Sequence, residues 1–192
     1  MDDGSTDNTA EIIKLLYYPQ VSVLRLEANQ GKASAVLKGA KETDCEYVLL
    51  ADGDLQNIVV EEFTQAVLAI RSNPYVDMLI LRRINKDPLT RLLRGDIMIT
   101  GERIVRRADL LGMLTGNRVE GFQLEVALNQ YMLDENKIVR WLPVSSTGVI
   151  SYRKLGFWQG VKKEIQMFTT IFSYIGIKYL MQQFLFLGRQ RL

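Results

Sequence analysis

The sequence has no histidine and a single cysteine, Cys45, in 192 residues. Without imidazole the chain cannot form a Ser-His-Asp triad, and most zinc centres would lack a usual ligand. One cysteine excludes a disulfide within the chain and fits a reducing compartment such as the cytoplasm. These two absences argue against serine-hydrolase chemistry and against most zinc chemistry.

The sequence also has little net charge, only +2, which gives no indication of a nucleic-acid partner. The charge is unevenly spread, because residues 153–192 contain seven basic side chains and one acidic side chain, Glu164. The preceding part is therefore acidic overall. With 47% hydrophobic and 24% charged residues, the composition is ordinary for one globular domain.

Long apolar runs are scarce too. A transmembrane helix needs about 20 apolar residues, and Lys178 and Gln182–Gln183 interrupt the apolar segment 160–192. This segment predicts one or two amphipathic helices, with an apolar stripe made of Phe168, Phe172, Ile175 and Tyr179. Such helices with basic residues suit a membrane surface, although a hairpin packed on the domain or on a second subunit fits equally. We therefore separate residues 153–192 from a main domain at 1–152.

Strand-like and helix-like patterns alternate along the main domain. Short apolar runs predict strands at 21–26, 47–52, 76–82, 100–107 and 137–144. Helical patterns begin at Asn8, where Glu11 completes a capping-box signature, and near Lys32. Further helices are predicted at 60–71, 89–98 and 121–133. The alternation predicts an α/β fold with a mostly parallel sheet, and the run 47–52 predicts a strand buried on both faces.

Three oxygen-bearing side chains, Asp52, Asp54 and Gln56, end the strand predicted at 47–52 and follow it at alternate positions. In an extended backbone, residues two apart point the same way. Mg²⁺ and Mn²⁺ prefer oxygen ligands and keep positions open for water and substrate phosphates. Ligands of open α/β sheets bind beyond the carboxyl ends of the strands. The stretch predicts a metal-bound diphosphate, although Asp-Gly-Asp is also common in simple turns.

Three stretches, "DDGSTDNT", "NQGKASAVLKGA" and "ADGDLQ", resemble in this order the glycosyltransferases of family 2, which have the GT-A fold. The chain is similar in particular to polyprenyl-phosphate (dolichol-phosphate) sugar synthases, through "TGERIVRRADLL" and "EGFQLEVALN" to about Tyr152. The resemblance implies transfer of a sugar, with inversion, from a UDP- or GDP-sugar to an acceptor. In the family, "DDGS" follows a second strand, so we expect a chain truncated at its N-terminus, with its first strand missing.

The resemblance also assigns roles to residues of the donor site. Asp3 would hydrogen-bond the nucleotide base, and Lys32 would lie near the nucleotide. Asp52, Asp54 and Gln56 match the motif that holds the metal and the diphosphate. The divalent ion, Mg²⁺ or Mn²⁺, would stabilise the diphosphate leaving group.

Further residues are assigned to the phosphates and to the acceptor. Four basic residues would contact donor or acceptor phosphates: Arg83, Arg91, Arg153 and Lys154. Each could instead be a solvated surface charge. Glu125 is the candidate base for an acceptor hydroxyl, with a plain helix-surface glutamate as the alternative. Asp54 and Glu125 are thus the catalytic candidates.

Two other interpretations stay open. A truncated chain could be an inactive relic that only binds nucleotide or metal, and a nucleotidyltransferase could share the topology. For the transferase, we expect a nucleotide-sugar donor, a lipid-phosphate acceptor and a cytoplasmic location at the inner membrane surface. We expect no nucleic-acid partner, and a homo-oligomer is compatible with the sequence.

Overall fold

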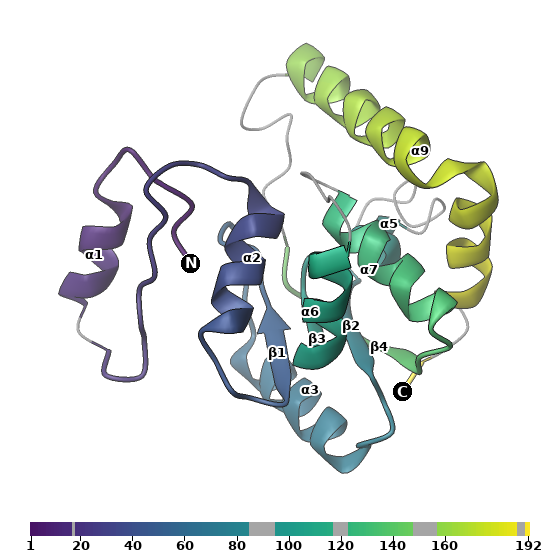
Figure 1. Ribbon diagram of the computed structural model, residues 1–192, viewed down its shortest axis with the longest axis horizontal. Coiled ribbons are helices and arrows are strands. Elements are labelled where there is room, and N and C mark those ends of the chain that lie inside the picture. The colour runs from purple at the N-terminus through teal and green to yellow at the C-terminus, as the bar shows by residue number, and fades with distance from the viewer. Residues whose placement is uncertain (17, 85–94, 117–122, 148–156, 188–190) are drawn as a thin grey trace.

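The computed structural model describes residues 1–16, 18–84, 95–116, 123–147, 157–187 and 191–192. A four-stranded sheet forms its centre, in the order β1-β3-β2-β4. The strands are β1 (Tyr47–Leu50), β2 (Met78–Arg83), β3 (Arg103–Arg106) and β4 (Val139–Val144). Helices pack on both faces of this sheet (Figure 1), so the predicted α/β class is confirmed.

The sheet is mixed and partly parallel. β3 lies antiparallel to both β1 and β2, whereas β2 and β4 pair in parallel, so β1, β2 and β4 all run in one direction. The alternation of strands and helices favours parallel pairing, but the apolar pattern of a short strand such as β3 does not encode its direction. Tertiary pairing decided the direction of this strand.

The two faces of β2 separate the core into two layers. Met78 and Ile80 face a cluster built with α2 (Lys32–Lys41), α6 (Arg107–Gly116) and α7 (Gln123–Asp134). Leu79 and Leu81 face the other cluster, which includes α3 (Val60–Ser72). Alternate side chains of a strand point to opposite faces, so a continuous apolar run suits a strand covered on both sides. The sequence did not indicate α6 as a separate helix.

Two predicted strands differ from the expectation, one in its burial and the other in its pairing. β1 lies at the edge of the described sheet, and Leu49 is 41% exposed, so β1 is not buried on both faces. Residues 21–26 make a single bridge, between Asp2 and Arg25, and belong to no strand of the sheet. An apolar run forms a strand only along the length over which a partner runs beside it, and the sequence does not show how far that partner extends.

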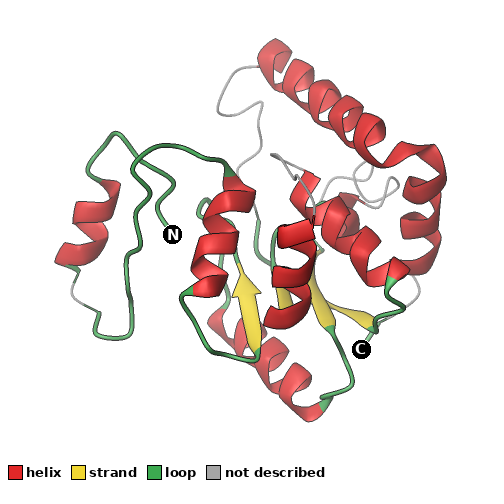
Figure 2. Cartoon of the chain, viewed as in Figure 1, coloured by secondary structure: helices red, strands yellow, loops and turns green. Residues whose placement is uncertain are grey.

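The N-terminal helix α1 (Thr9–Leu15) forms where the sequence predicts it but lacks the predicted cap. The Asn8 side chain makes no capping hydrogen bond. Instead, the Asp7 carboxylate accepts hydrogen bonds from the Thr9 amide, at 3.1 Å, and from the Thr9 hydroxyl. Figure 2 shows α1 set apart from the body of the molecule on loops.

The chain closes with α9 (Phe157–Leu187), which is two helical segments joined at Gly176, where φ is 71°. This agrees with the prediction of one or two helices. Among the described helices, none is long and apolar enough to cross a bilayer. Of the predicted stripe, Tyr179 is exposed, and the other three side chains lie outside the described set. Within the predicted helix 89–98, the described part is α5 (Gly95–Met98).

Candidate active site

Asp52 is held between two cations that come from different elements. It follows β1 by two residues, and its carboxylate accepts hydrogen bonds from Lys32 Nζ at 2.7 Å and Arg83 Nη2 at 3.0 Å. Lys32 is the first residue of α2, and Arg83 is the last residue of β2. The fold thus brings three sequence-predicted residues together beyond the carboxyl ends of β1 and β2.

A buried glutamate fixes the arginine of this group. Arg83 donates from Nε to Glu102 Oε2 at 2.6 Å and from Nη2 to Glu102 Oε1. The Thr100 hydroxyl donates to the same carboxylate at 2.7 Å, and Glu102 is fully buried. Such two-point contacts between guanidinium and carboxylate are strong and fix the planar group. Burial opposes the charge of Arg83, but Glu102 and Asp52 outweigh it and raise the pKa of Arg83.

Lys32 also joins Asp52 to Glu125 in the first turn of α7. Lys32 Nζ donates to Glu125 Oε1 at 2.6 Å. Glu125 is 4% exposed, and its Oε2 is a buried oxygen without a hydrogen-bond partner among the described residues. Burial works against the charge of Lys32, but Glu125 and Asp52 prevail and raise the pKa of the lysine. A buried acceptor without a donor is costly, so Oε2 is a natural place for a ligand hydroxyl.

The same contacts keep Asp52 ionised. Burial alone would raise the pKa of Asp52, but Lys32 and Arg83 overcome this and hold that pKa below its ordinary value. The close packing of this carboxylate also requires a glycine nearby. A Cβ on residue 101 would lie 2.3 Å from Asp52 Oδ1, so any side chain at Gly101 would displace the carboxylate.

A second buried arginine, Arg103, binds groups that lie next to the members of the cluster. Its guanidinium donates to the Thr100 carbonyl at 2.8 Å, to the Met98 carbonyl at 2.9 Å and to Asn129 Oδ1. It also reaches the Glu125 carbonyl at 3.3 Å, which ties it to the start of α7. Complete burial lowers the pKa of Arg103 to about 10, although Glu125 and other nearby acids act against this.

Glu102 and Arg103 were not singled out by the sequence. They occupy consecutive positions in "TGERIVRR", where several charges flank a short apolar run. The only local signal was a charged side chain at the start of a predicted strand. That signal is too common to identify a site, because exposed strand ends usually carry charges.

The other two members of the predicted metal motif lie in an exposed loop. Asp54 and Gln56 are exposed, and the backbone of Gln56 pairs with Thr147 through hydrogen bonds of 2.8 and 2.9 Å. Asn57 Nδ2 donates to the Thr147 hydroxyl at 3.0 Å. These contacts join the loop after β1 to the segment that follows β4.

In the described part of the chain, the side chains around this loop do not enclose a divalent ion. No group of three histidine, cysteine or acidic side chains in the described part of the chain is placed to hold a metal. Both oxygens of Asp52 already accept hydrogen bonds from cations. Mg²⁺ and Mn²⁺ sites of phosphate enzymes need only one or two carboxylates, because water and substrate phosphates supply the rest. The exposed oxygens of Asp54 and Gln56 fit an ion shared with a substrate, and do not fit one enclosed by protein.

Asp3 orders the loop ahead of α2. Its two carboxylate oxygens accept hydrogen bonds from the Gln30 and Gly31 amides, each at 2.8 Å. Its neighbour Asp2 is buried and accepts a hydrogen bond from the Ser5 amide at 2.9 Å. Hydrogen bonds from Ser5 lower the pKa of Asp2. The contact of Asp3 with a nucleotide base stays a prediction.

The remaining predicted phosphate contacts, Arg91, Arg153 and Lys154, lie outside the described residues. Among the described residues, the structure joins four of the predicted ones directly by hydrogen bonds: Lys32, Asp52, Arg83 and Glu125.

Comparison with known proteins identifies the family of this chain. Residues 1–124 match the sequence profile described as glycosyl transferase family 2. The chain belongs to this family. A segment of 55 residues is 44% identical to the poly-beta-1,6-N-acetyl-D-glucosamine synthase of Staphylococcus epidermidis, covering 28% of this chain and 13% of that protein. A segment of 91 residues is 33% identical to a dolichyl-phosphate beta-glucosyltransferase of Trichomonas vaginalis, covering 46% of this chain and 24% of that protein.

Solved structures of similar fold are found as well. A glucosyl-3-phosphoglycerate synthase from Mycobacterium tuberculosis, in complex with Mn²⁺, UDP-glucose and phosphoglyceric acid, superposes with a TM-score of 0.63 at 20% identity. The superposition covers 88% of this chain and 65% of that one. The complex of the same enzyme with Mn²⁺, UDP and glucosyl-3-phosphoglycerate gives a TM-score of 0.62 at 19% identity, over 95% of this chain and 67% of that one. This family 2 chain thus has the GT-A fold.

Proposed function

We propose that this family 2 chain is a glycosyltransferase domain that transfers a sugar, with inversion, from a UDP- or GDP-sugar to an acceptor. The observation that carries the proposal is the chain of contacts Glu125–Lys32–Asp52–Arg83, which lies where an open α/β sheet binds its ligands. Family membership supports the same reaction class. The Mn²⁺ and UDP-glucose bound to a neighbour with this fold support the donor class.

The cations of the cluster would stabilise the leaving group. Negative charge builds up on the nucleotide diphosphate as the sugar bond breaks, so fixed positive charge there lowers the barrier. Lys32 and Arg83 are already oriented by carboxylates and need little rearrangement. A bound Mg²⁺ or Mn²⁺, held by Asp54 and Gln56 beside Asp52, would supply further charge stabilisation to the diphosphate.

Glu125 would serve as the base for an acceptor hydroxyl. Its Oε1 is bound to Lys32, while Oε2 has no hydrogen-bond donor among the described residues and can accept the proton. An acceptor phosphate would need no strong base, because it is already ionised near neutral pH. The activity of Glu125→Gln with the two kinds of acceptor therefore distinguishes them.

A lipid phosphate at a membrane surface is the acceptor we propose. The dolichyl-phosphate glucosyltransferase among the relatives supports this substrate class. The outer side of α9 is also apolar, since Ile177, Met181 and Leu185 are 69%, 60% and 56% exposed. Residues four apart share one face of a helix, so these three form a stripe that can enter the membrane interface.

The test of the donor site is a calorimetric titration of UDP- and GDP-sugars with and without Mn²⁺. We expect the wild-type chain to bind one donor class tightly only when the metal is present. Asp54→Asn should weaken the metal-dependent binding by roughly tenfold or more, because the ion loses a carboxylate ligand.

The matched control is Asp44→Asn, which neutralises another exposed aspartate outside the cluster and should bind like the wild type. Equal binding of the donor with and without metal would contradict the proposed metal role. Release of free UDP or GDP with a polyprenyl phosphate then measures turnover. Donor binding without any release would identify an inactive binder in place of an enzyme.

A further inference from the structure

A cleft between α7 and α9 is lined by none of the four residues of the candidate active site. It has a volume of about 440 Å³, which is within the range of small-molecule sites. The cleft is lined from α7 by Tyr131 and Asp134 and from just beyond α7 by Glu135. Asp134 is nine residues after Glu125, or about 14 Å along a helix at 1.5 Å per residue. The cleft begins at Ala127, two residues after Glu125, and its acidic end at Asp134 is separate from the Glu125–Lys32–Asp52 cluster.

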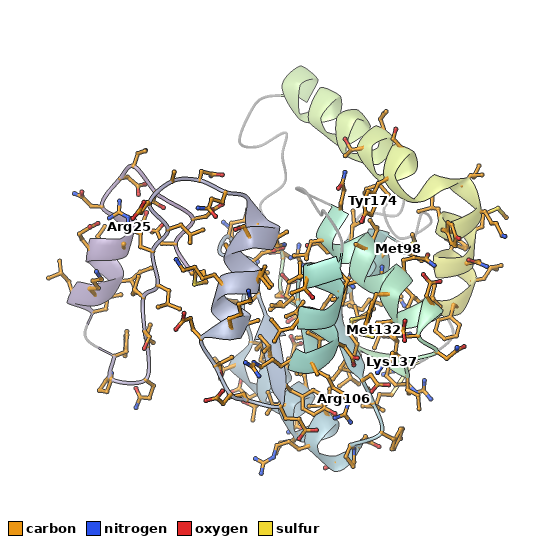
Figure 3. The ribbon with its side chains drawn as sticks, viewed as in Figure 1. Arg25, Met98, Arg106, Met132, Lys137 and Tyr174 are labelled. Carbon is orange, nitrogen blue, oxygen red and sulfur yellow. The ribbon has the colours of Figure 1, made fainter. Side chains whose placement is uncertain are left out.

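Three tyrosines form much of the wall of this cleft. Tyr131 comes from α7, and Tyr174 and Tyr179 come from the two segments of α9. Tyr174 is partly buried on the side of α9 that packs on the core (Figure 3). The Tyr131 hydroxyl points toward α6, since a Cβ on Gly112 would lie 3.1 Å from it. The ring of Tyr131, more than its hydroxyl, is thus left to the cleft.

The charge of the cleft is negative. Asp134 and Glu135 contribute carboxylates, and no lysine or arginine lines the described walls. Both acids lie at the C-terminal end of α7, which is the negative end of the helix dipole. The nearby Lys137 is engaged elsewhere, with Asp109 at 2.8 Å.

Both acids are exposed, one of them is oriented by a neighbouring amide, and the tyrosine rings stay neutral. Asp134 Oδ1 accepts a hydrogen bond from Gln130 Nε2 at 2.7 Å, which orients its carboxylate. Burial, with Asp109 and Glu135, raises the pKa of Tyr131, and burial raises the pKa of Tyr174. Neutral phenol rings present an electron-rich face to a cation.

We propose that this cleft binds an organic cation whose alkylammonium group lies beside Asp134 and Glu135 and against the tyrosine faces. The cleft does not suit a metal ion, because its described walls are largely aromatic and offer few oxygen ligands. A cation with an apolar body gains from both the rings and the carboxylates. The ammonium group can belong to a soluble molecule or to a lipid headgroup reached from the exposed side of α9.

The test is calorimetry on the full chain with choline and with its uncharged carbon analogue, 3,3-dimethylbutan-1-ol. We expect choline to bind on the order of tenfold more tightly, because the two probes differ only in charge. Added salt should weaken the binding of choline and leave that of the alcohol unchanged.

Two kinds of variant distinguish the contribution of the carboxylates to choline binding from that of the aromatic rings. The double variant Asp134→Asn/Glu135→Gln should bind choline about tenfold less tightly. The control Asp44→Asn/Glu61→Gln, which removes two exposed acids elsewhere, should bind it normally. Tyr174→Phe keeps the ring face and should keep the affinity, whereas Tyr174→Leu should lose several-fold.

Equal affinity for choline and the alcohol, or full affinity in the double acid variant, would overturn the proposal. Vesicles of phosphatidylcholine and of a lipid without ammonium groups then identify the source. Preferential capture of the first supports a headgroup, and binding of free choline alone supports a soluble ligand. No step of this test requires glycosyl transfer, so its result is independent of the proposed enzymatic function.

Discussion

At the scale of single residues, the candidate active site depends on the buried acid Glu102. Its carboxylate takes two donors from Arg83 and one from Thr100, and no part of the residue is exposed. Arg83 Nη2 also donates to Asp52, and Asp52 in turn accepts a hydrogen bond from Lys32. Each charge is held by a neighbour of opposite sign, so removing one member should disturb the whole group.

Glu102→Gln should lower the free energy of unfolding by about 3 kcal/mol, since breaking a buried ion pair leaves an uncompensated charge inside the protein. Urea denaturation measures this change. The control is Glu46→Gln, which removes an exposed partner of Arg106 and should cost less than about 1 kcal/mol. Equal losses in the two variants would show that the buried pair has no special role.

Much of this site could be predicted residue by residue. Asp52, Lys32 and Arg83 were marked by short sequence patterns, and the structure joins them. Glu102 could not be found, because its role comes from a contact with a residue 19 positions earlier in the chain. A charge beside an apolar run does not reveal its partner until the strands are paired.

At the scale of elements, α9 is attached to the domain by a buried amide. Gln183 is fully buried on the second segment of α9, and its Nε2 donates to the Val126 carbonyl at 3.1 Å. Its Oε1 accepts from Asn129 Nδ2, also at 3.1 Å, and Asn129 binds Arg103 beneath the active-site cluster. The C-terminal helix is thus linked through α7 to the site.

Gln183→Leu should lower the free energy of unfolding by about 1–3 kcal/mol, because Asn129 and the Val126 carbonyl lose partners in a buried place. The matched control is Gln182→Leu at the exposed neighbouring position, which should change stability by less than about 0.5 kcal/mol. Denaturation curves of the two variants test this. No difference between them would mean that the buried amide does not secure the helix.

Most elements, but not their pairing, followed from the sequence. The helices α2, α3 and α7 lie where apolar periodicity predicts them, and so do the strands β2 and β4. The direction of β3 and the exposed edge position of β1 did not follow. Periodicity reports whether one side of a segment is apolar, whereas pairing depends on which distant segment lies beside it.

At the scale of the whole molecule, the exposed stripe Ile177, Met181 and Leu185 faces outward on α9, opposite the buried Gln183 and Leu187. The sequence contains no acidic residue after Glu164. An apolar stripe in a basic segment suits a membrane with anionic lipids.

Vesicles with anionic lipid should therefore sediment the chain. The double variant Met181→Glu/Leu185→Glu should bind at least tenfold less, because burying each of these side chains contributes roughly 1.5–3 kcal/mol. Val67→Glu/Leu68→Glu, at exposed apolar positions of α3, is the control and should bind as the wild type does. Loss of sedimentation in both double variants, or in neither, would contradict a specific role for α9.

The sequence by itself determined the family, the α/β class and the four residues that the structure joins. These depend on local order along the chain: short motifs, apolar periods and the spacing of charges. Only the tertiary structure decided the direction of β3, the burial of Glu102 beneath Arg83 and the cleft between α7 and α9. Each of these arises from contact between segments far apart in the chain, and no local pattern specifies which distant residue will be the partner.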